Sequence, residues 1–495
     1  MRSTLIKYTW LLMLACTLGS CKKWLDLQPE TEISKDELFK TEAGFFEALN
    51  GAYTKCTEEG LYGLELTMGF PEVLAQNYTV EQGNDPKGYL QTAQYNYKDG
   101  NFINRKDNAW RTFYNAIVNS NLIISEIDAK KNVFNPGNYE LVKGEAFALR
   151  AFLHFDVFRL FGSNLAAKKV GIPYVTAYSN KVTPTASADE VLNNIVKDLE
   201  QAKVLLKGVD SILSATYKVG YPVADDSATE TSSKSLFLQN RRHRLNYYAV
   251  CGELARVYLY KNDKQNALLN AEEVIASKKF PWVKTVDFIS VKPEEKDVIL
   301  YPELIFMWPV QERTSAIFNF FQTGPGGIQL KETTYKSIYE SGSVGAEDNR
   351  YKHWFSIFDQ NFMRIMKYAR NPNGDEDDQF ANRYPQVVPA IRLSEMYYIA
   401  AEASFESNPA KALDYFNTVR MNRGIGTKLN TASYATFMDE LVKEARKEFY
   451  AEGQLFYLYK RLNRSIVGQL GNQIAPSPEI FILPLPNDEI EFGGR

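Results

Sequence analysis

Cysteine and histidine are both rare in this chain of 495 residues, which contains four of the first and three of the second. Two of the cysteines fall within the first 21 residues, so only Cys56 and Cys251 remain to form a disulfide in the body of the protein. The sequence leaves open whether they pair, but it lacks a disulfide framework, and the core has to supply the stability. The few histidines argue against a histidine-based metal cluster, and HExxH, GxSxG and P-loop patterns do not occur.

Long apolar runs and an excess of basic charge are also missing. Beyond residue 20, no segment approaches the roughly 18 uninterrupted apolar residues of a membrane-spanning helix. Lysine and arginine total 57 against 60 aspartates and glutamates, which gives a formal net charge of −3. Because no basic stripe is present to neutralise phosphates, nucleic acid is not expected as a partner.

The N-terminus carries the pattern of a lipoprotein signal. Arg2 and Lys7 form a positive start, residues 8–15 are apolar, and Leu18-Gly19-Ser20-Cys21 has the small residues and the cysteine of a lipobox. We expect residues 1–20 to be removed as a signal peptide and Cys21 to be acylated, so that residues 21–35 tether the protein to a membrane. The alternative is an ordinary cleaved signal with a cysteine there by chance.

A helical-hairpin pattern occurs twice, and its copies lie 145 residues apart. The first copy spans roughly residues 246–277, with Ala255 and Ala267 as its small residues and Asn262-Asp263 at its turn. The second has Ala400 and Ala412 at the equivalent positions. This is the spacing of tetratricopeptide repeats (TPR), in which small residues let two antiparallel helices approach closely. We therefore predict a mainly α fold, in which TPR-like helical repeats form a scaffold.

Further helices are predicted at 36–58, 106–127, 139–161 and 188–206. Four segments are too long for ordinary connections and are predicted to be irregular, loop-rich insertions: 60–104, 208–242, 279–388 and 464–495. Within the second of these, the Ser-, Thr- and Asp-rich stretch 220–235 is predicted to be a mobile surface loop. We expect a single domain over 36–495, with an N-terminal part at 36–300 and a C-terminal part at 301–495.

An acidic loop at 371–378 has a density of oxygen atoms that would suit calcium. The ligand spacing and the closing glutamate of an EF-hand are missing, so a solvated turn is the favoured interpretation. We therefore expect no cofactor, and bound calcium has no further support in the sequence.

Charged residues at helical spacing predict buried ion pairs in the second repeat. Arg392, Glu395 and Glu402 share one helical face and could pair with Arg420 or Arg423 of the adjacent helix. The alternative, a catalytic pair of carboxylates such as glycosidases use, is less favoured. We do not expect an enzyme.

Short motifs also run in order along the mature chain. In the N-terminal half they are Trp24-Leu25-Asp26-Leu27-Gln28-Pro29, a W-x3-Y-x2-I-x3-N pattern from Trp110 to Asn121, and Gly171-Ile172-Pro173. In the C-terminal half they are Asp348-Asn349-Arg350, Arg392-Leu393-Ser394-Glu395, Arg420-x-x-Arg423-Gly424 and Pro484-x-Pro486. Together these motifs resemble the SusD/RagB family of outer-membrane nutrient-binding surface lipoproteins. Residues 454–459 and the final Gly-Gly-Arg depart from the family pattern, which leaves the ligand undetermined.

The resemblance implies a SusD-like fold and a function in nutrient capture without bond cleavage. The protein would be anchored in the outer membrane through Cys21, its sole membrane attachment, and would face the cell exterior. It would pass glycans to a SusC-like TonB-dependent outer-membrane barrel. Peptides are the alternative ligand, as in the RagB branch of the family. A glycan-active enzyme and a repeat scaffold for protein partners are less favoured alternatives.

The ligand is expected to bind to aromatic rings and polar side chains in the loops. In this family the ligand site lies in the loops before the W-x3-Y helix and in the large insertion, and there we predict Asn77, Tyr78, Tyr95, Tyr97 and Phe320. The alternative for each ring is core packing. The stretch 318–327 combines apolar rings with a glycine-rich turn that is too short for a helix, and it would form an exposed patch for a partner or ligand. Trp110 is expected in the core.

Overall fold

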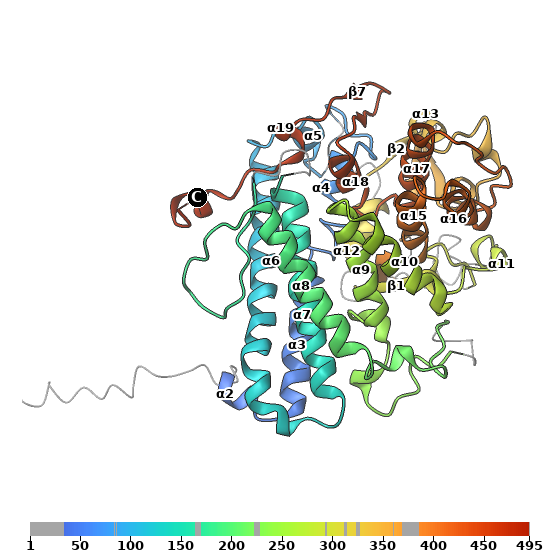
Figure 1. Cartoon of the computed structure of the whole chain (residues 1–495). Helices are drawn as coiled ribbons and strands as arrows, with labels where there is room; N and C mark the ends of the chain where they lie inside the picture. The colour runs from blue at the N-terminus through green and yellow to red at the C-terminus, as the bar shows by residue number, and fades with distance from the viewer. Residues whose placement is uncertain are drawn as a thin grey trace, which may run out of the picture.

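A computed structural model of the chain is mainly helical (Figure 1). The structure describes residues 34–494, except for 84, 86, 164–169, 222–227, 293–294, 311–313, 323–326, 360 and 369–385. Cys21, the motif at 24–29 and the acidic loop at 371–378 lie outside the described residues, so the predictions made for them stay predictions. Within the described ranges, no helix has both the length and the apolar character needed to cross a bilayer.

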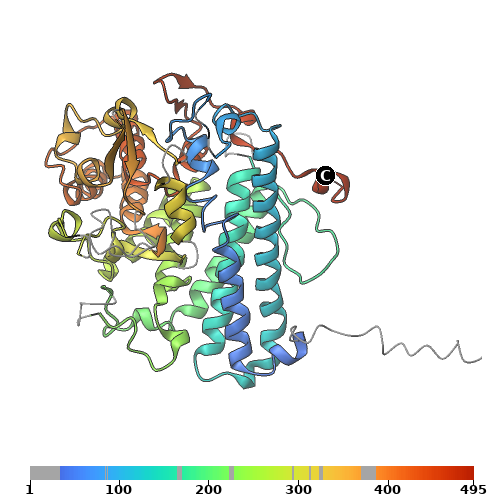
Figure 2. The same cartoon turned by 180° about the vertical axis from the view of Figure 1, so that it is seen from behind.

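Long helices of the N-terminal half run alongside one another on one side of the molecule (Figures 1 and 2). The helices of this half are α2 (Lys35–Leu38), α3 (Glu42–Cys56), α4 (Phe70–Leu74), α5 (Leu90–Ala93), α6 (Gly100–Ile127), α7 (Asn138–Phe161) and α8 (Ala188–Leu206). The helix predicted at 188–206 is confirmed, and so is the one at 139–161 to within one residue. Helix α6 begins earlier than predicted, because the Asp99 side chain accepts the N–H groups of Asn101 and Phe102 and caps the helix there.

Helix α7 is the central member of this group and contacts α3, α6, α8 and α9. Its alternating alanines and phenylalanines are buried, as predicted. Gly144 lets α8 approach closely, since a Cβ atom at this position would lie 2.9 Å from Leu206 Cγ. Helix α8 starts at a capping box in which Ser187 and Glu190 satisfy each other's backbone N–H groups.

The two predicted TPR-like hairpins are present and stack on each other through α10 and α15. The helices of this region are α9 (Tyr247–Tyr260), α10 (Lys264–Ser277), α15 (Leu393–Ser404), α16 (Pro409–Asn422), α17 (Tyr434–Glu448) and α18 (Leu455–Leu462). The small residues Ala255, Ala267, Ala400 and Ala412 are all fully buried. Asp263, predicted at the first turn, caps α10 by accepting a backbone N–H group, and Asn408 caps α16 in the same way.

Short elements fill the insertions. The helices are α11 (Thr285–Phe288), α12 (Thr314–Gln322), α13 (Glu332–Ile338), α14 (Asn349–His353), α19 (Pro478–Phe481) and α20 (Asn487–Glu491). The 3-10 helices are η2 (Asp128–Val133), η3 (Ser211–Leu213), η4 (Leu236–Leu238), η5 (Arg241–His243), η6 (Tyr301–Glu303) and η9 (Val344–Ala346). Among the described residues, strands form three antiparallel sheets: β1 (Leu304–Pro309) with β5 (Val387–Arg392); β2 (Leu330–Lys331), β4 (Phe362–Ile365) and β3 (Phe355–Asp359); and β6 (Ile466–Val467) with β7 (Gln473–Ile474).

Cys56 and Cys251 are both buried free thiols, which decides the question that the sequence left open. The Cys56 thiol donates to the carbonyl of Ala52, one turn earlier in α3. Burial raises the pKa of both thiols, so they stay protonated and unreactive in the folded protein.

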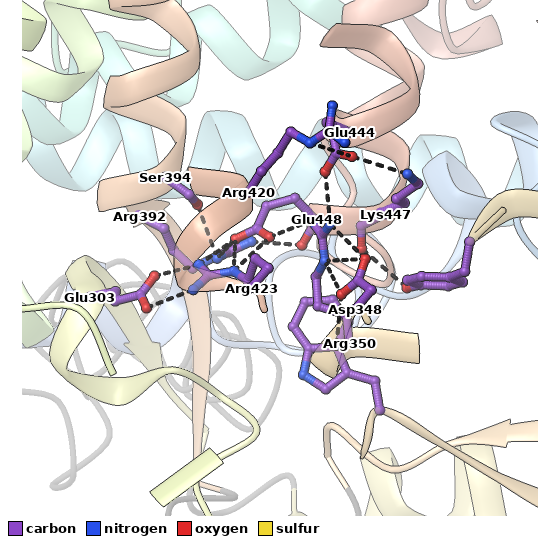
Figure 3. Close-up of polar contacts among 12 residues, drawn as sticks. Glu303, Asp348, Arg350, Arg392, Ser394, Arg420, Arg423, Glu444, Lys447 and Glu448 are labelled. Atoms are coloured by element: carbon purple, nitrogen blue, oxygen red, sulfur yellow. Dashed lines mark hydrogen bonds and ion pairs between the residues drawn. The ribbon is translucent and has the colours of Figure 1, made fainter. Parts of the chain in front are cut away.

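A cluster of buried charges holds the C-terminal half together, with Glu448 at its centre (Figure 3). We name it the Glu448 cluster, and its members are Glu303, Asp348, Arg350, Arg392, Arg420, Arg423, Glu444, Lys447, Glu448 and Glu452. Three guanidinium groups surround the Glu448 carboxylate, those of Arg350 at 2.8 Å, Arg392 at 2.5 Å and Arg423 at 2.7 Å. They come from α14, the end of β5 and the end of α16, so one side chain of α17 connects three other segments.

The partners in this cluster differ from those predicted. Arg423 pairs with Glu303 and Glu448, rather than with Glu395 or Glu402. Glu395 pairs with Arg256 of α9, and Glu402 pairs with Arg461 of α18. The prediction that these charges are paired is confirmed, but the predicted partners are wrong, because helical spacing shows which residues share a face and not which helix lies opposite.

Removal of the central carboxylate should destabilise the fold strongly. Glu448→Gln leaves three buried guanidinium groups without their shared counter-charge, so we expect the free energy of unfolding to fall by about 3–5 kcal/mol. Denaturant unfolding measures this. Glu440→Gln on the same helix is the control, because its ion pair with Lys443 is partly exposed and should contribute only about 0–1 kcal/mol. Equal losses in the two variants would contradict the central role of Glu448.

The cluster also predicts how stability depends on pH. Burial acts to raise the pKa of Glu444, but Arg350 and Lys447 outweigh it and lower the pKa to about 2. A lowered carboxyl pKa contributes stability above the unfolded value of about 4.3, and this is lost as the pH falls towards 2. Urea unfolding between pH 7 and pH 2.5 should show this loss, with a shallower fall in Glu444→Gln. An unchanged slope in that variant would contradict the assignment.

Candidate functional site

The structure brings three of the predicted site residues close together, but it places them in the interior. Asn77 is 0%, Tyr78 1% and Phe320 4% exposed. The Tyr78 ring packs edge to face on Phe320 and on Tyr450 of the C-terminal half. Burial leaves none of the three with a surface for direct ligand contact in this conformation. The core-packing alternative holds for both rings.

Asn77 belongs to a group of hydrogen bonds between residues 72–77 and residues 450–453, which we name the Glu72 clamp. The buried Glu72 carboxylate accepts the N–H groups of Ala451 at 3.0 Å and Gly453 at 2.7 Å, and the Asn77 side-chain amide at 2.7 Å. The Tyr450 hydroxyl donates to the Asn77 carbonyl at 2.7 Å. Burial outweighs these hydrogen bonds and raises the pKa of Glu72 to about 7. Asn77 thus has a positional role.

Strained backbone marks both sides of this clamp. Gln76 and Ala451 have positive φ angles of 60°. Non-glycine residues rarely adopt this conformation unless surrounding contacts impose it. Here the Gln76 carbonyl accepts a hydrogen bond from Arg446, and the Ala451 N–H donates to Glu72. The loop that leads to Tyr95 and Tyr97 is therefore fixed at its start.

Tyr95 and Tyr97 keep part of their surface exposed, so their predicted contact with ligand stays a prediction. Both hydroxyls are engaged, since Tyr95 donates to the Leu74 carbonyl and Tyr97 to the Ile480 carbonyl. The Tyr97 ring also stacks on Phe102, with 4.6 Å between the centroids. Only their remaining ring edges are available to a ligand.

The aromatic rings of the 318–327 stretch belong to a helix that the sequence did not predict. Residues up to Gln322 belong to α12, and Phe320 and Phe321 point into the core while Phe318 is half-buried. The prediction grouped the rings with the glycines that follow them. It therefore missed that Thr314–Ile317, before the rings, form the first turn of the same helix. The exposed aromatic patch predicted for 318–327 is therefore wrong for its two buried rings.

The surface does offer a large groove, which lies elsewhere, along α3. We name it the α3 groove; its volume is about 720 Å³ and its lining includes Phe46, Glu47, Asn50, Thr54, Leu236, Phe237, Gln239, Asn240, His243, Arg244, Pro309 and Val310. Helix α3 forms one wall, the segment from η4 to η5 forms the other, and the end of β1 closes one end. The sequence did not predict this groove, because the polar residues on the outward face of α3 are typical of any solvent-exposed helix face.

The α3 groove combines ring edges and uncharged hydrogen-bonding groups with the charged side chains of Glu47, Glu58 and Arg244. Phe46 and Phe237 stack across it with 3.7 Å between centroids, and the Arg244 guanidinium lies 3.7 Å from the Phe237 centroid. Burial and the nearby Arg242 lower the pKa of His243 to about 4, so its imidazole is neutral at pH 7. Asn50 and Thr54 are exposed on α3, and Leu236 is 82% exposed opposite them. Such a mixture suits a ligand with both apolar faces and hydroxyl or amide groups.

A second groove, of about 470 Å³, lies along α6 and is bounded by the 179–183 loop and the C-terminal segment. Trp110 lines it but is only 3% exposed, and its indole N–H donates to Glu489 at 3.1 Å. The prediction that Trp110 belongs to the core is confirmed.

Metal binding finds no support in the described part of the chain, where no three histidine, cysteine, aspartate or glutamate side chains are grouped to hold an ion. The three histidines lie in different elements, at α7, η5 and α14.

Comparisons with known proteins match the chain along most of its length. A sequence profile described as starch-binding associating with outer membrane matches residues 23–218, and the SusD family profile matches residues 247–475. The SusD-like proteins P38 and P2 of Formosa agariphila are each 23% identical to the chain. The alignments cover 93% of the chain and 92% of P38, and 98% of the chain and 97% of P2.

Solved structures show the same fold. A SusD superfamily protein from Bacteroides thetaiotaomicron is 21% identical, with a TM-score of 0.69 over 92% of this chain and 98% of its own. A putative sugar binding protein from Bacteroides vulgatus is 19% identical, with a TM-score of 0.68 over 91% and 96%. Since the two profiles follow one another in order and the shared fold extends over nearly the whole chain, the chain belongs to the SusD/RagB family.

Proposed function

We propose that the protein is a lipid-anchored surface protein that captures oligo- or polysaccharides and delivers them to a partner TonB-dependent outer-membrane transporter. The observation that carries this proposal is the match of the two family profiles to consecutive parts of the chain, one of them described by starch binding at the outer membrane. A solved structure of the same fold is named as a putative sugar binding protein. The protein would bind its ligand without cleaving it.

The α3 groove is the described surface that suits a glycan best. Its ring edges and Leu236 can contact the apolar C–H faces of sugar rings, while Asn50, Thr54 and Gln239 can exchange hydrogen bonds with hydroxyl groups. Tyr95 and Tyr97 form the other proposed contact, on the loop before α6. The groove is the stronger candidate, because its hydrogen-bonding side chains on α3 are exposed whereas both tyrosine hydroxyls are already engaged.

Truncation of the exposed groove side chains should weaken glycan binding. We expect the combined variant Asn50→Ala, Thr54→Ala and Leu236→Ala to lose about tenfold or more in affinity, because it removes two hydrogen-bonding groups and one apolar contact. Isothermal titration against a panel of glycans measures the affinity, and chromatography of the incubated glycans should detect no cleavage. All three side chains are exposed, so stability should stay within about 0.5 kcal/mol of wild type.

Leu269→Ala is the control for that experiment, because Leu269 is an exposed leucine of α10 outside the groove. Unchanged affinity in the combined variant would exclude the α3 groove, and the same titration with Tyr95→Ala and Tyr97→Ala would then test the loop. Binding of a peptide panel in place of glycans would assign the protein to the peptide-binding branch. Released sugar products would contradict a pure binding function.

The lipid anchor and the transporter are tested together in cells. We expect wild-type protein to sediment with outer membranes and to co-purify with a large β-barrel, whereas Cys21→Ala loses acylation and most of its membrane retention. The purified variant should keep its glycan affinity, because Cys21 is not among the residues that line the α3 groove. Full membrane retention of Cys21→Ala without a co-purifying barrel would contradict both parts of this proposal.

A further inference from the structure

The α3 groove contains one carboxylate that the rest of the described chain leaves unpaired. Glu47 is exposed on α3 and lines the groove, and none of the described residues forms an ion pair or a hydrogen bond with its side chain. It lies one helical turn from Asn50 and follows Phe46, and all three line the same groove. A solvated glutamate is negatively charged at neutral pH, so this charge is available to a ligand.

The other charges of the lining are balanced within the protein. Glu58 accepts a hydrogen bond from Lys55 at 2.8 Å. Arg244 belongs to a buried group of two guanidinium groups and two carboxylates, made up of Arg241, Arg244, Glu145 and Asp210. Its guanidinium also donates to the Phe237 carbonyl. Among the described residues of the lining, the charge of Glu47 is therefore a surplus negative charge.

Hydrogen-bond donors of the lining are also engaged by the protein. The Gln239 amide donates to the Ser233 carbonyl at 2.7 Å, and the Thr57 hydroxyl donates to the Thr54 carbonyl at 2.9 Å. What these two side chains still offer a ligand is mainly their oxygen atoms, which accept hydrogen bonds. The groove therefore favours a ligand that is rich in donors.

We propose that the α3 groove selects glycans with protonated amino groups, such as oligomers of glucosamine, and that Glu47 determines this specificity. An ammonium group brings a positive charge and three N–H donors, and it accepts no hydrogen bond. Phe46 stacks on Phe237 directly beside Glu47, so the C–H face of a sugar can contact the rings while its amino group pairs with the carboxylate. The same charge disfavours glycans that carry uronate or sulfate groups.

This inference rests on the proposed capture of glycans in the α3 groove, to which it adds the chemical class of the ligand. Cello-oligosaccharides and glucosamine oligosaccharides of equal length are matched probes, because both are β-1,4-linked and differ only in a hydroxyl or an amino group at C2. A galacturonate oligosaccharide of the same length supplies the opposite charge.

Isothermal titration of the purified protein at low salt compares these probes. We expect the glucosamine oligosaccharide to bind about two- to fivefold more tightly than the cello-oligosaccharide, as for a partly exposed ion pair, and the galacturonate to bind more weakly than either. Added salt should reduce the preference. A pH at which the amino groups are neutral should remove it, because Glu47 remains charged there.

Substitution of Glu47 tests which charge is responsible. Glu47→Gln should bring the ratio of the glucosamine and cello-oligosaccharide affinities to about one, and Glu47→Lys should make the galacturonate bind more tightly than the glucosamine oligosaccharide. The side chain is exposed, so both variants should fold. Glu491→Gln is the matched control, because it removes the same charge from an exposed position of α20 outside the groove and should keep the wild-type ratio.

Failure of this inference can be told apart from failure of the proposed function. Equal affinity of the wild-type protein for the glucosamine and cello-oligosaccharides would overturn selection by charge and leave glycan capture standing. A preference for glucosamine that survives in Glu47→Gln would overturn the role of Glu47. Absence of binding to every glycan tested would overturn the proposed function itself, and the inference with it.

Discussion

The fold of the C-terminal half depends on one carboxylate surrounded by three guanidinium groups. Glu448 lies on α17, and its partners Arg350, Arg392 and Arg423 come from three other segments. Burial alone would raise the pKa of Glu448, but the arginines hold it well below its usual value, so the side chain is ionised. Such a cluster is stable only when every member is present, because each unpaired charge would be left desolvated. It therefore fixes how α14, α16 and α17 lie relative to β5.

Neighbouring ion pairs extend this principle into the N-terminal half. Arg256 of α9 pairs with Glu395 of α15, and Arg241 pairs with both Asp210 and Glu145 of α7. These contacts join helices that the apolar core alone would allow to slide, since hydrophobic burial is not directional. The α3 groove lies between α3 and the η4–η5 segment, and the ion pairs of Arg241 hold η5 in place, so the shape of this groove depends on buried charges.

The sequence predicted the helices well, because their signals are local. Alanine spacing located both TPR-like hairpins, and the apolar periodicity of 188–206 located α8. Contacts between distant segments were not predictable in this way. Glu230 lies in a stretch predicted to be a mobile loop, yet it is 4% exposed and pairs with Arg242. Nothing near Glu230 in sequence indicates that partner.

The candidate site was harder to predict than the fold for the same reason. Tyr78 and Phe320 occur in polar, irregular segments, which suggested that their rings are exposed. The Tyr78 ring instead packs against Tyr450, which is distant in sequence. The Phe320 ring packs against Phe321, the next residue of the same helix. Conversely, Asn50 and Thr54 are ordinary residues of a solvated helix face until the η4–η5 segment is placed opposite them. Aromatic content predicted that the loops would fold, but not which of their rings would remain at the surface.

The Glu72 clamp has a consequence for the order in which the chain folds. Glu72 and Ala451 are 379 residues apart in sequence, so their hydrogen bond closes a loop of nearly the entire folded body. Contacts of such long range form late, because the entropy of loop closure opposes them until intervening helices have packed. We therefore expect the start of the loop before α6 to become ordered only after α17 and the turn that follows it have packed. A chain that lacks its last 45 residues or so would hold its N-terminal helices but not yet this loop.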